Sequence, residues 1–314
     1  MTGGQSAVRM NDRHSFPVGG LVELSRATYQ STPLSVVEIR PTVFSFIGAG
    51  GTVTAVGGSE ECAVIDTGYG PRVPEIRSAI AGALHQSARW LIDTHWHFDH
   101  TDGNSWFAED QSTVVGHANC RARMSRDQFV PSLEWSVRSS PRSAWPVLTF
   151  NAAVSIDLGS QTLELIPQEP AHTDGDVVVW LPAANVLVMG DLMTNGTYPV
   201  IDESSCGSLH GMIQAIERLL PFINAETAVV PGHGPIATGD DLVNFNDTLR
   251  TIEGRVQRLI AAGCSVAEIL AAAPSAEFDP VWGRGYVIGT VFVRMILAGL
   301  GLTEKNLDRN ERLT

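Results

Sequence analysis

The sequence has few cysteines and little positive charge, and both shortages narrow what the protein can be. Four cysteines occur in 314 residues, at positions 62, 120, 206 and 264, and no two of them form a CxxC pair. We therefore expect no disulfide framework and a reducing, cytoplasmic setting. Lysine and arginine total 21 against 34 aspartates and glutamates. This balance disfavours a nucleic-acid partner, because nucleic-acid binders usually carry a basic face.

Long apolar runs are also missing. A membrane-spanning helix needs about 18 or more consecutive apolar residues. The most apolar stretch, 287–302, is interrupted by Arg294 and by three glycines. The first 30 residues contain Arg9, Asp12 and Arg13 and no apolar core, so no secretory signal peptide is expected. We expect a protein with a small-molecule substrate and no membrane partner, and the oligomeric state stays open.

The pattern of the chain predicts two similar halves, each with strands followed by a helix. Short β-branched segments bounded by glycines predict strands, and apolar residues three and four apart predict helices. Two sheets face to face with helices outside satisfy this order, a four-layer αβ/βα sandwich of the mixed α/β (α+β) class with C-terminal helices. Strands are predicted at 42–46, 53–56, 62–66, 90–92, 114–115, 153–158, 161–167, 177–180, 186–189 and 228–231, and helices at 73–83, 105–107, 117–124, 212–220, 241–262, 266–272 and 289–300.

Composition divides the chain into three parts. Residues 1–35 are predicted to be a polar leader, 36–240 the main domain, and 241–314 a helical extension packed on that domain. Within the domain, 125–150 has three prolines and little periodicity, so we interpret it as an excursion or lid. Its tryptophans, Trp135 and Trp145, either line a substrate pocket or pack the lid onto the body.

A cluster of histidines carries the chemistry. Three of the nine histidines fall in Thr94-His95-Trp96-His97-Phe98-Asp99-His100-Thr101-Asp102-Gly103-Asn104, directly after a predicted strand. In extended backbone, side chains two residues apart point the same way, so His95 and His97 can bind one ion. After the turn, Asp99 and His100 can reach a second. Imidazole and carboxylate are the ligands that zinc prefers at hydrolytic sites.

Further donors lie beside other apolar strands. His172 precedes the strand at 177, Asp191 follows 186–189, and His233 lies between two glycines after 228–231. Asp66 ends an earlier strand, and we expect it to organise the ligands rather than to bind metal. The remaining histidines, at positions 14, 85, 117 and 210, stand alone and are expected to be ordinary surface or core residues.

The ordered set of these motifs resembles the signature of the metallo-β-lactamase superfamily over about residues 40–240. The resemblance implies an αβ/βα sandwich and two zinc ions per chain, with iron or manganese as alternative metals. It implies that His95, His97 and His172 bind the first ion, that Asp99, His100 and His233 bind the second, and that Asp191 bridges them.

One aspartate indicates the branch of this superfamily. A bridging Asp191 is similar to glyoxalase II, lactonases and bacterial lactamase-like hydrolases, whereas many lactamases place cysteine there. Asn195 and Tyr198 follow Asp191 closely, so they either face substrate or form a structural turn.

The resemblance implies a zinc-dependent hydrolase in which a metal-bridging hydroxide attacks the carbonyl of an ester, lactone, thioester or β-lactam-like amide. Asp99 or a metal-bound water is the candidate proton donor to the leaving group. Two alternatives stay open: a mononuclear iron persulfide dioxygenase of the same fold, and a metal-stabilised binding protein without catalysis.

Overall fold

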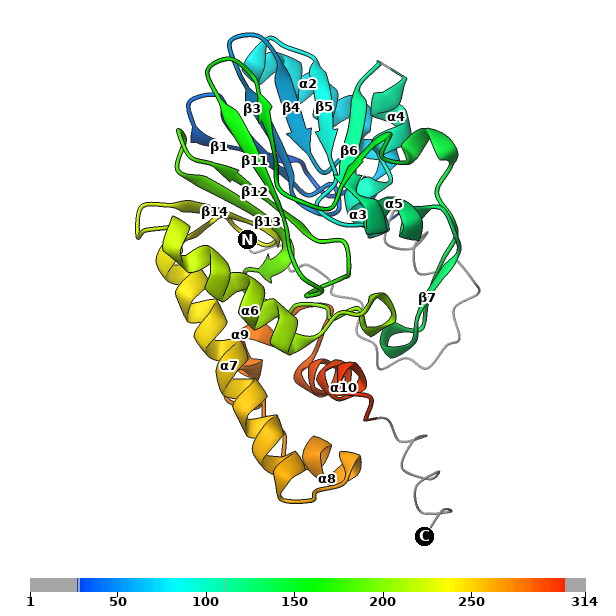
Figure 1. Cartoon of the computed structure of the whole chain (residues 1–314), viewed down its shortest axis with the longest axis vertical. Helices are drawn as coiled ribbons and strands as arrows, with labels where there is room; N and C mark the ends of the chain where they lie inside the picture. Colours follow the sequence, from blue (N-terminus) through cyan, green and yellow to red (C-terminus); the bar gives the residue numbers. More distant parts are fainter. Residues whose placement is uncertain (1–26, 28, 110, 303–314) are drawn as a thin grey trace.

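The computed structural model describes residues 27, 29–109 and 111–302, and the fold is a pair of stacked sheets with helices on both outer sides (Figure 1). Figure 1 shows the sheets in the upper part of the molecule and the helices that follow β13 below them.

The first sheet has seven strands in the order β1-β2-β3-β4-β5-β6-β9. Strands β1 to β4 pair antiparallel, and β4, β5, β6 and β9 pair parallel. The parallel half matters for function, because the carboxyl ends of its strands meet at one edge. The strands are β1(Ser35–Arg40), β2(Val43–Ile47), β3(Val53–Gly57), β4(Cys62–Ile65), β5(Ala88–Ile92), β6(Thr113–His117) and β9(Leu148–Phe150).

The second sheet has six strands in sequence order. All neighbours pair antiparallel except β13 and β14, which are parallel. This exception brings the ends of β13 and β14 to the same edge. The strands are β10(Val154–Asp157), β11(Thr162–Pro167), β12(Val177–Leu181), β13(Val186–Thr194), β14(Ala228–His233) and β15(Ala237–Thr238).

Three apolar cores define four layers. The central core joins the inner faces of both sheets, for example Ile65 and Ile92 with Leu165 and Val188. A second core packs α2 and α4 on the first sheet, and a third packs α6, α7 and α10 on the second. The predicted αβ/βα sandwich is therefore confirmed. The helices are α2(Val73–Leu84), α3(Phe98–Thr101), α4(Asn104–Ala108), α5(Ala118–Met124), α6(Leu209–Leu219), α7(Gly239–Ala261), α8(Val266–Ala271), α9(Asp279–Trp282) and α10(Gly289–Gly299).

Two segments differ from the sequence prediction. The polar leader predicted for 1–35 lies mostly outside the described residues. The edge strand β1, which the sequence did not predict, begins at Ser35, the last residue assigned to that leader. The excursion at 125–150 is partly regular: β7(Gln128–Val130) and β8(Trp135–Val137) form a hairpin, and β9 joins the first sheet. Strands of three residues are too short to show a period in the sequence.

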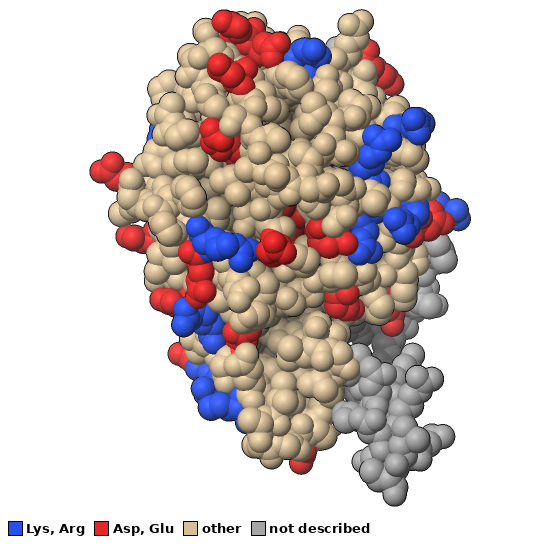
Figure 2. All heavy atoms as spheres, in the orientation of Figure 1, with Lys and Arg blue, Asp and Glu red and all other residues tan. Residues whose placement is uncertain are grey.

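The surface agrees with the acidic composition. The face in Figure 2 carries acidic and basic side chains in interspersed positions and no continuous basic surface. Among the described residues, no helix is both long and apolar enough to cross a membrane.

Candidate metal centre

The fold brings seven predicted donor side chains to one sheet edge. His95 and His97 follow β5, and Asp99 and His100 lie on the short α3. The loop between β11 and β12, β13 and the end of β14 supply the other three donors, His172, Asp191 and His233. These segments are far apart in sequence, and they meet because parallel pairing aligns the ends of neighbouring strands.

Four of the donors form a buried first group, His95, His97, His172 and Asp191, whose ligand atoms all lie within 4.8 Å of one another. His97 Nδ1 lies 2.9 Å from His172 Nε2. Asp191 Oδ2 lies 4.0 Å from His95 Nε2 and 3.8 Å from His172 Nε2. The described residues thus place three imidazoles and one carboxylate around a common point.

The remaining donors form a second group, Asp99, His100 and His233, with ligand atoms within the same limit of 4.8 Å. His233 Nε2 lies 3.2 Å from Asp99 Oδ2 and 3.4 Å from His100 Nε2. The second carboxylate oxygen of Asp191 faces this group, 3.1 Å from His100 Nε2. Asp191 therefore lies between the groups and presents one oxygen to each, the position that the family resemblance implied.

The donor atoms are placed to bind a metal ion and are not fully paired with one another by hydrogen bonds. His95 Nε2 is buried and has no hydrogen-bond partner among the described residues. A buried polar atom without a partner costs free energy, so such atoms usually mark an ion, a water or a functional role. A set of imidazole nitrogens and carboxylate oxygens fits zinc and similar first-row metals. The residues present therefore fit the group that the motifs predict.

In His97, His100 and His172, the ring nitrogen that points away from the donor group contacts an oxygen of a neighbouring residue. His97 Nε2 lies 3.2 Å from Asp202 Oδ2, and His100 Nδ1 lies 2.7 Å from Asp66 Oδ2. His172 Nδ1 lies 2.8 Å from the carbonyl oxygen of Val200. Such contacts fix the tautomer and ring orientation of metal-binding histidines. They leave the other nitrogen of each ring to face the donor group.

Asp66 occupies a rigid position behind the donors. It is 1% exposed and has a positive φ of 58°. Its carboxylate accepts hydrogen bonds from the backbone N–H and the hydroxyl of Thr94, both at 2.8 Å. Asp66 therefore links β4 to the loop that carries His95 and orients His100 at the same time.

Asp202 was not predicted from the sequence. It is fully buried, and its carboxylate contacts His97 and accepts hydrogen bonds from Ser204 Oγ and the Ser205 backbone. Its backbone N–H donates to the His172 carbonyl. Nothing in the sequence around Asp202 marks it, because its partner lies 105 residues away.

Two glycines allow the backbone to approach the donors. A Cβ atom at Gly51 would lie 2.3 Å from His100 Cε1, and one at Gly232 would lie 1.9 Å from Asp191 Oδ1. Both distances are far below van der Waals contact, so any side chain would displace a donor. The glycine-rich turn at 48–51 thus forms one wall of the second group.

The two groups differ in their affinity for protons. Burial lowers the pKa of His95 and His172, that of His172 to about 4, and neighbouring imidazoles add to this effect. Burial also opposes charge on His100 and His233, but nearby carboxylates, above all Asp191, outweigh it and raise the pKa of both. Without a metal, His95 and His172 are therefore neutral at neutral pH, whereas His100 and His233 bind protons more readily than a free imidazole.

The four predicted substrate-facing residues have different surroundings. The Trp135 ring lies 6.1 Å from the His97 ring and is half-buried. Trp145 donates to the Ser140 carbonyl and packs within the excursion. Asn195 donates to the Pro235 carbonyl, which braces the loop of His233. Of these three side chains, Trp135 is therefore the one that lies beside the donors.

Tyr198 lies in the core. It is 2% exposed, its hydroxyl contacts Asp279 Oδ1 at 2.8 Å, and its ring stacks on Phe292 at 4.7 Å. These contacts join the loop after β13 to the C-terminal helices. Its role is therefore the structural one of the two alternatives, because ring and hydroxyl are both engaged in the core.

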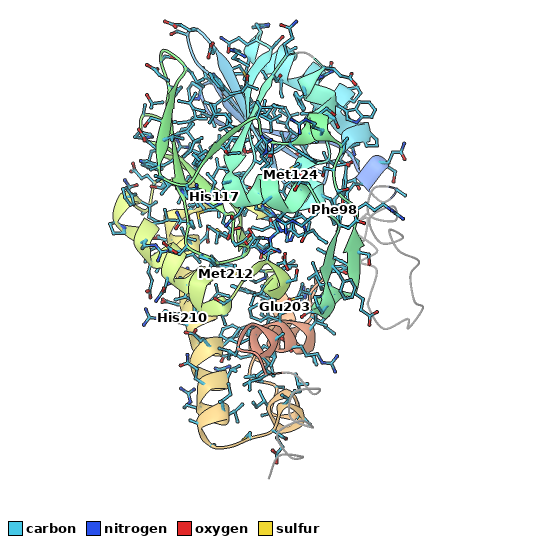
Figure 3. The ribbon with its side chains drawn as sticks, turned by 45° about the vertical axis from the view of Figure 1, so that its right-hand side comes forward. Phe98, His117, Met124, Glu203, His210 and Met212 are labelled. Atoms are coloured by element: carbon cyan, nitrogen blue, oxygen red, sulfur yellow. The ribbon has the colours of Figure 1, made fainter. Side chains whose placement is uncertain are left out.

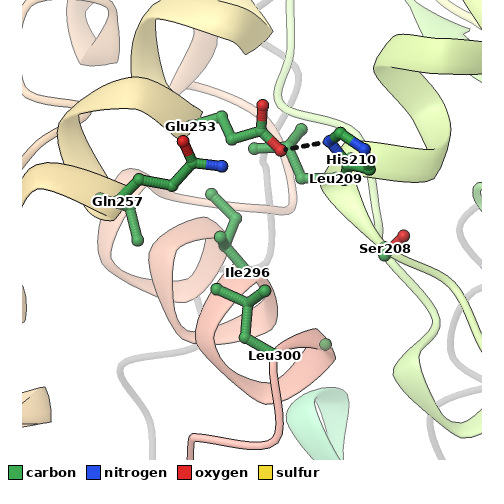
Figure 4. Close-up of a pocket in the computed structure, with 9 residues that line it drawn as sticks. Ser208, Leu209, His210, Glu253, Gln257, Ile296 and Leu300 are labelled. Carbon is green, nitrogen blue, oxygen red and sulfur yellow. Dashed lines mark hydrogen bonds and ion pairs between the residues drawn. The ribbon is translucent and has the colours of Figure 1, made fainter. Parts of the chain in front are cut away.

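A separate small surface cavity lies between α6, α7 and α10 (Figure 4). The ion pair between His210 Nδ1 and Glu253 Oε1, 3.1 Å long, forms part of its lining. None of the seven donors lines this cavity. It is therefore distinct from the candidate metal centre.

Comparison with known proteins identifies relatives with related chemistry. The family model described as the metallo-beta-lactamase superfamily matches residues 47–235, which include all seven donors. The acyl-coenzyme A thioesterase of Homo sapiens is 28% identical over 203 residues, covering 57% of this chain and 71% of that protein. The hydroxyacylglutathione hydrolase of Rhodospirillum rubrum is 27% identical over 173 residues, covering 55% of this chain and 57% of that protein.

Solved structures share the fold. A metallo-beta-lactamase from Pontibacter korlensis superposes with a TM-score of 0.57 at 24% identity, covering 69% of this chain and 99% of that one. A stereoselective inverting sec-alkylsulfatase from a Pseudomonas species superposes with a TM-score of 0.65 at 14% identity. That match covers 95% of this chain and 55% of the sulfatase, so it extends over most of the C-terminal helices.

Proposed function

The chain belongs to the metallo-β-lactamase superfamily, and we propose that it is a binuclear zinc hydrolase that cleaves a thioester of a small acyl compound. The observation that carries the proposal is the convergence of seven donors in two groups that share Asp191. The second group favours two metals over the single iron of a persulfide dioxygenase, because in a mononuclear site Asp99, His100 and His233 would be gathered together without a metal to bind.

The chain's own residues orient the reaction. Metal ions held here would supply Lewis acidity toward a carbonyl oxygen and lower the pKa of water. Asp66 and Asp202 fix the rings of His100 and His97, and Asp191 presents one oxygen to each group. The side chains of Asp99 and His233 are 16% and 29% exposed, so substrate approaches from the second group. Asp99 can there accept the proton that the attacking water loses and pass it to the leaving thiolate.

The thioester assignment rests on the chemistry of the relatives. The human relative is named for acyl-coenzyme A thioesters, and the Rhodospirillum rubrum relative for hydroxyacylglutathione, also a thioester. A β-lactamase from Bacteroides fragilis is 20% identical over 230 residues, covering 70% of this chain and 86% of that protein. Esters, lactones and β-lactams are therefore included in the test.

The test combines metal analysis with a substrate panel. We expect close to two zinc ions per chain and turnover of thioesters in preference to esters, lactones and β-lactams. His97→Ala should lose metal and lower kcat/KM by about 100-fold or more. The control is His210→Ala, which removes an exposed histidine on α6 that pairs with Glu253. One iron per chain with persulfide oxidation, or full zinc content with no turnover of any panel member, would overturn the proposal.

A further inference from the structure

A row of aromatic side chains runs beside the metal centre. Ring centroids are 5.5 Å apart from Tyr29 to Tyr69, 6.0 Å from Tyr69 to Phe98, and 5.7 Å from Phe98 to Trp135. Tyr286 continues the row at 5.7 Å from Trp135. Figure 3 shows Phe98 beside the hairpin β7–β8. The row is therefore built from the N-terminal segment, the donor loop, the excursion and the C-terminal helices.

Trp135 and Tyr286 are both half-buried and lie at the end of the row that is nearer the C-terminal helices. Trp135 Nε1 donates to Tyr286 Oη at 2.8 Å, a contact across 151 residues of sequence. The indole therefore has no polar atom left for a ligand, and its accessible part is carbon. Tyr286 lies outside the matched family range 47–235, in the connection between α9 and α10. The family signature alone could not have identified it.

The hairpin that carries Trp135 is fixed to the outer contacts of the donors. The backbone N–H of Ser132, at the tip of the hairpin, donates to Glu203 Oε1 at 2.9 Å. Glu203 follows Asp202, which holds His97. The position of the Trp135 ring relative to His97 is therefore set by two independent contacts, Glu203 at one end and Tyr286 at the other.

We propose that Trp135 and Tyr286 form an apolar wall that takes the acyl chain of the substrate and makes the enzyme selective for extended or aromatic acyl groups over acetyl. The inference rests on the proposed hydrolase function. An acyl compound whose carbonyl lies at the donors has its chain within reach of a ring that is 6.1 Å from His97. Burying apolar chain against such a ring is favourable, by about fourfold in kcat/KM for each methylene.

The hydroxyl of Tyr286 has a positioning role in this wall. It accepts the indole N–H and keeps the Trp135 ring on edge to His97, at an interplanar angle of 85°. Burial raises the pKa of Tyr286 to about 12, so the phenol stays neutral at physiological pH. A neutral phenol keeps the wall apolar.

The experiment uses acetyl, butanoyl and hexanoyl thioesters of one thiol, N-acetylcysteamine, so that only the acyl chain varies. We expect kcat/KM of the zinc-loaded wild type to rise with chain length. Trp135→Ala should lose about 10- to 100-fold on the hexanoyl thioester and less than about threefold on the acetyl thioester. Tyr286→Phe should raise KM for the hexanoyl thioester by about threefold to tenfold with kcat unchanged. The control is Trp106→Ala, a tryptophan that is 42% exposed on α4.

A second measurement separates this inference from the proposed function. Hexanoate, the expected product, should quench the fluorescence of the wild type and of Trp106→Phe but not of Trp135→Phe, with equal zinc content in all three. If no thioester is hydrolysed but this quench is present, the proposed thioesterase function is wrong, whereas the proposal that Trp135 and Tyr286 bind the acyl chain is supported. A chain-length preference that persists in Trp135→Ala, or a quench that persists in Trp135→Phe, would overturn the wall.

Discussion

Removing Asp202 should weaken metal binding at the first group without removing any metal ligand. Asp202 Oδ2 lies 3.2 Å from His97 Nε2, and the carboxylate is fully buried. The pKa of Asp202 lies below its usual range, because hydrogen bonding and charge from His97 outweigh the effect of burial. The carboxylate is therefore charged, and it holds the His97 ring with Nδ1 toward the donors.

The size of the effect follows from what Asp202→Ala leaves behind. The Nε2 proton of His97 would be buried without an acceptor, and the ring could rotate or change tautomer. Loss of such an outer partner costs about 10- to 100-fold in metal affinity, about 1.4 to 2.7 kcal/mol. Asp202 also accepts hydrogen bonds from Ser204 and Ser205, so we expect a loss of folding stability of about 1–3 kcal/mol as well. Asp202→Asn should lose less on both measures, because the amide oxygen can still accept from His97.

The assay is chelator competition with cobalt as the metal, whose absorption reports the geometry of its ligands. Thermal unfolding with and without metal separates lost stability from lost affinity. The control is Asp157→Asn, the same chemical change on the exposed turn between β10 and β11. Unchanged cobalt affinity and spectrum in a folded Asp202→Ala protein would refute the argument that Asp202 positions His97.

Three further outcomes are expected. Gly51→Ala should move the His100 ring by about 1 Å, because the new methyl group would lie 2.3 Å from that ring. Elemental analysis should then give one metal ion per chain instead of two. Lowering the pH should release metal from the second group first, because the raised pKa of His100 and His233 makes protons compete with metal there. Elemental analysis after desalting at pH 8, 7, 6 and 5 measures the metal that remains bound. Simultaneous loss of metal from both groups would contradict this expectation. Thiol labelling of the folded protein should modify the exposed Cys206 more than about 100-fold faster than Cys62, because Cys62 is buried and burial raises its pKa to about 12. Equal labelling rates would show that the core opens.

The convergence of the seven candidate donors could be predicted from the sequence because their signal is local. Three histidines within six residues cannot be explained by a structural role alone, and each distant donor lies beside an apolar strand. Strand ends are easily located, since an apolar run stops there. Parallel pairing of β4, β5 and β6, and of β13 and β14, then brings these ends together.

The contacts behind the donors could not be predicted in the same way. Asp202, Tyr286 and the anchoring role of Tyr198 depend on partners 105, 151 and 81 residues away. Periodicity and spacing report only which face of an element is buried, and a hydrogen bond between two loops leaves no periodic signal. The loop that holds both Tyr198 and Asp202 has no regular pattern, so only the folded structure distinguishes the anchor from the positioning residue.

The placement of these contacts separates metal binding from substrate choice. All seven donors lie within the matched family range, on strands or in segments that connect to the strands of the two sheets, which restrain them. Trp135 and Tyr286 lie instead on a short hairpin and on a connection between C-terminal helices, joined to each other by one hydrogen bond. Substitutions in this pair should therefore alter which acyl group is accepted while the metal content stays constant. Substitutions behind the donors, at Asp66 or Asp202, should lower metal affinity and thereby reduce turnover of every substrate together.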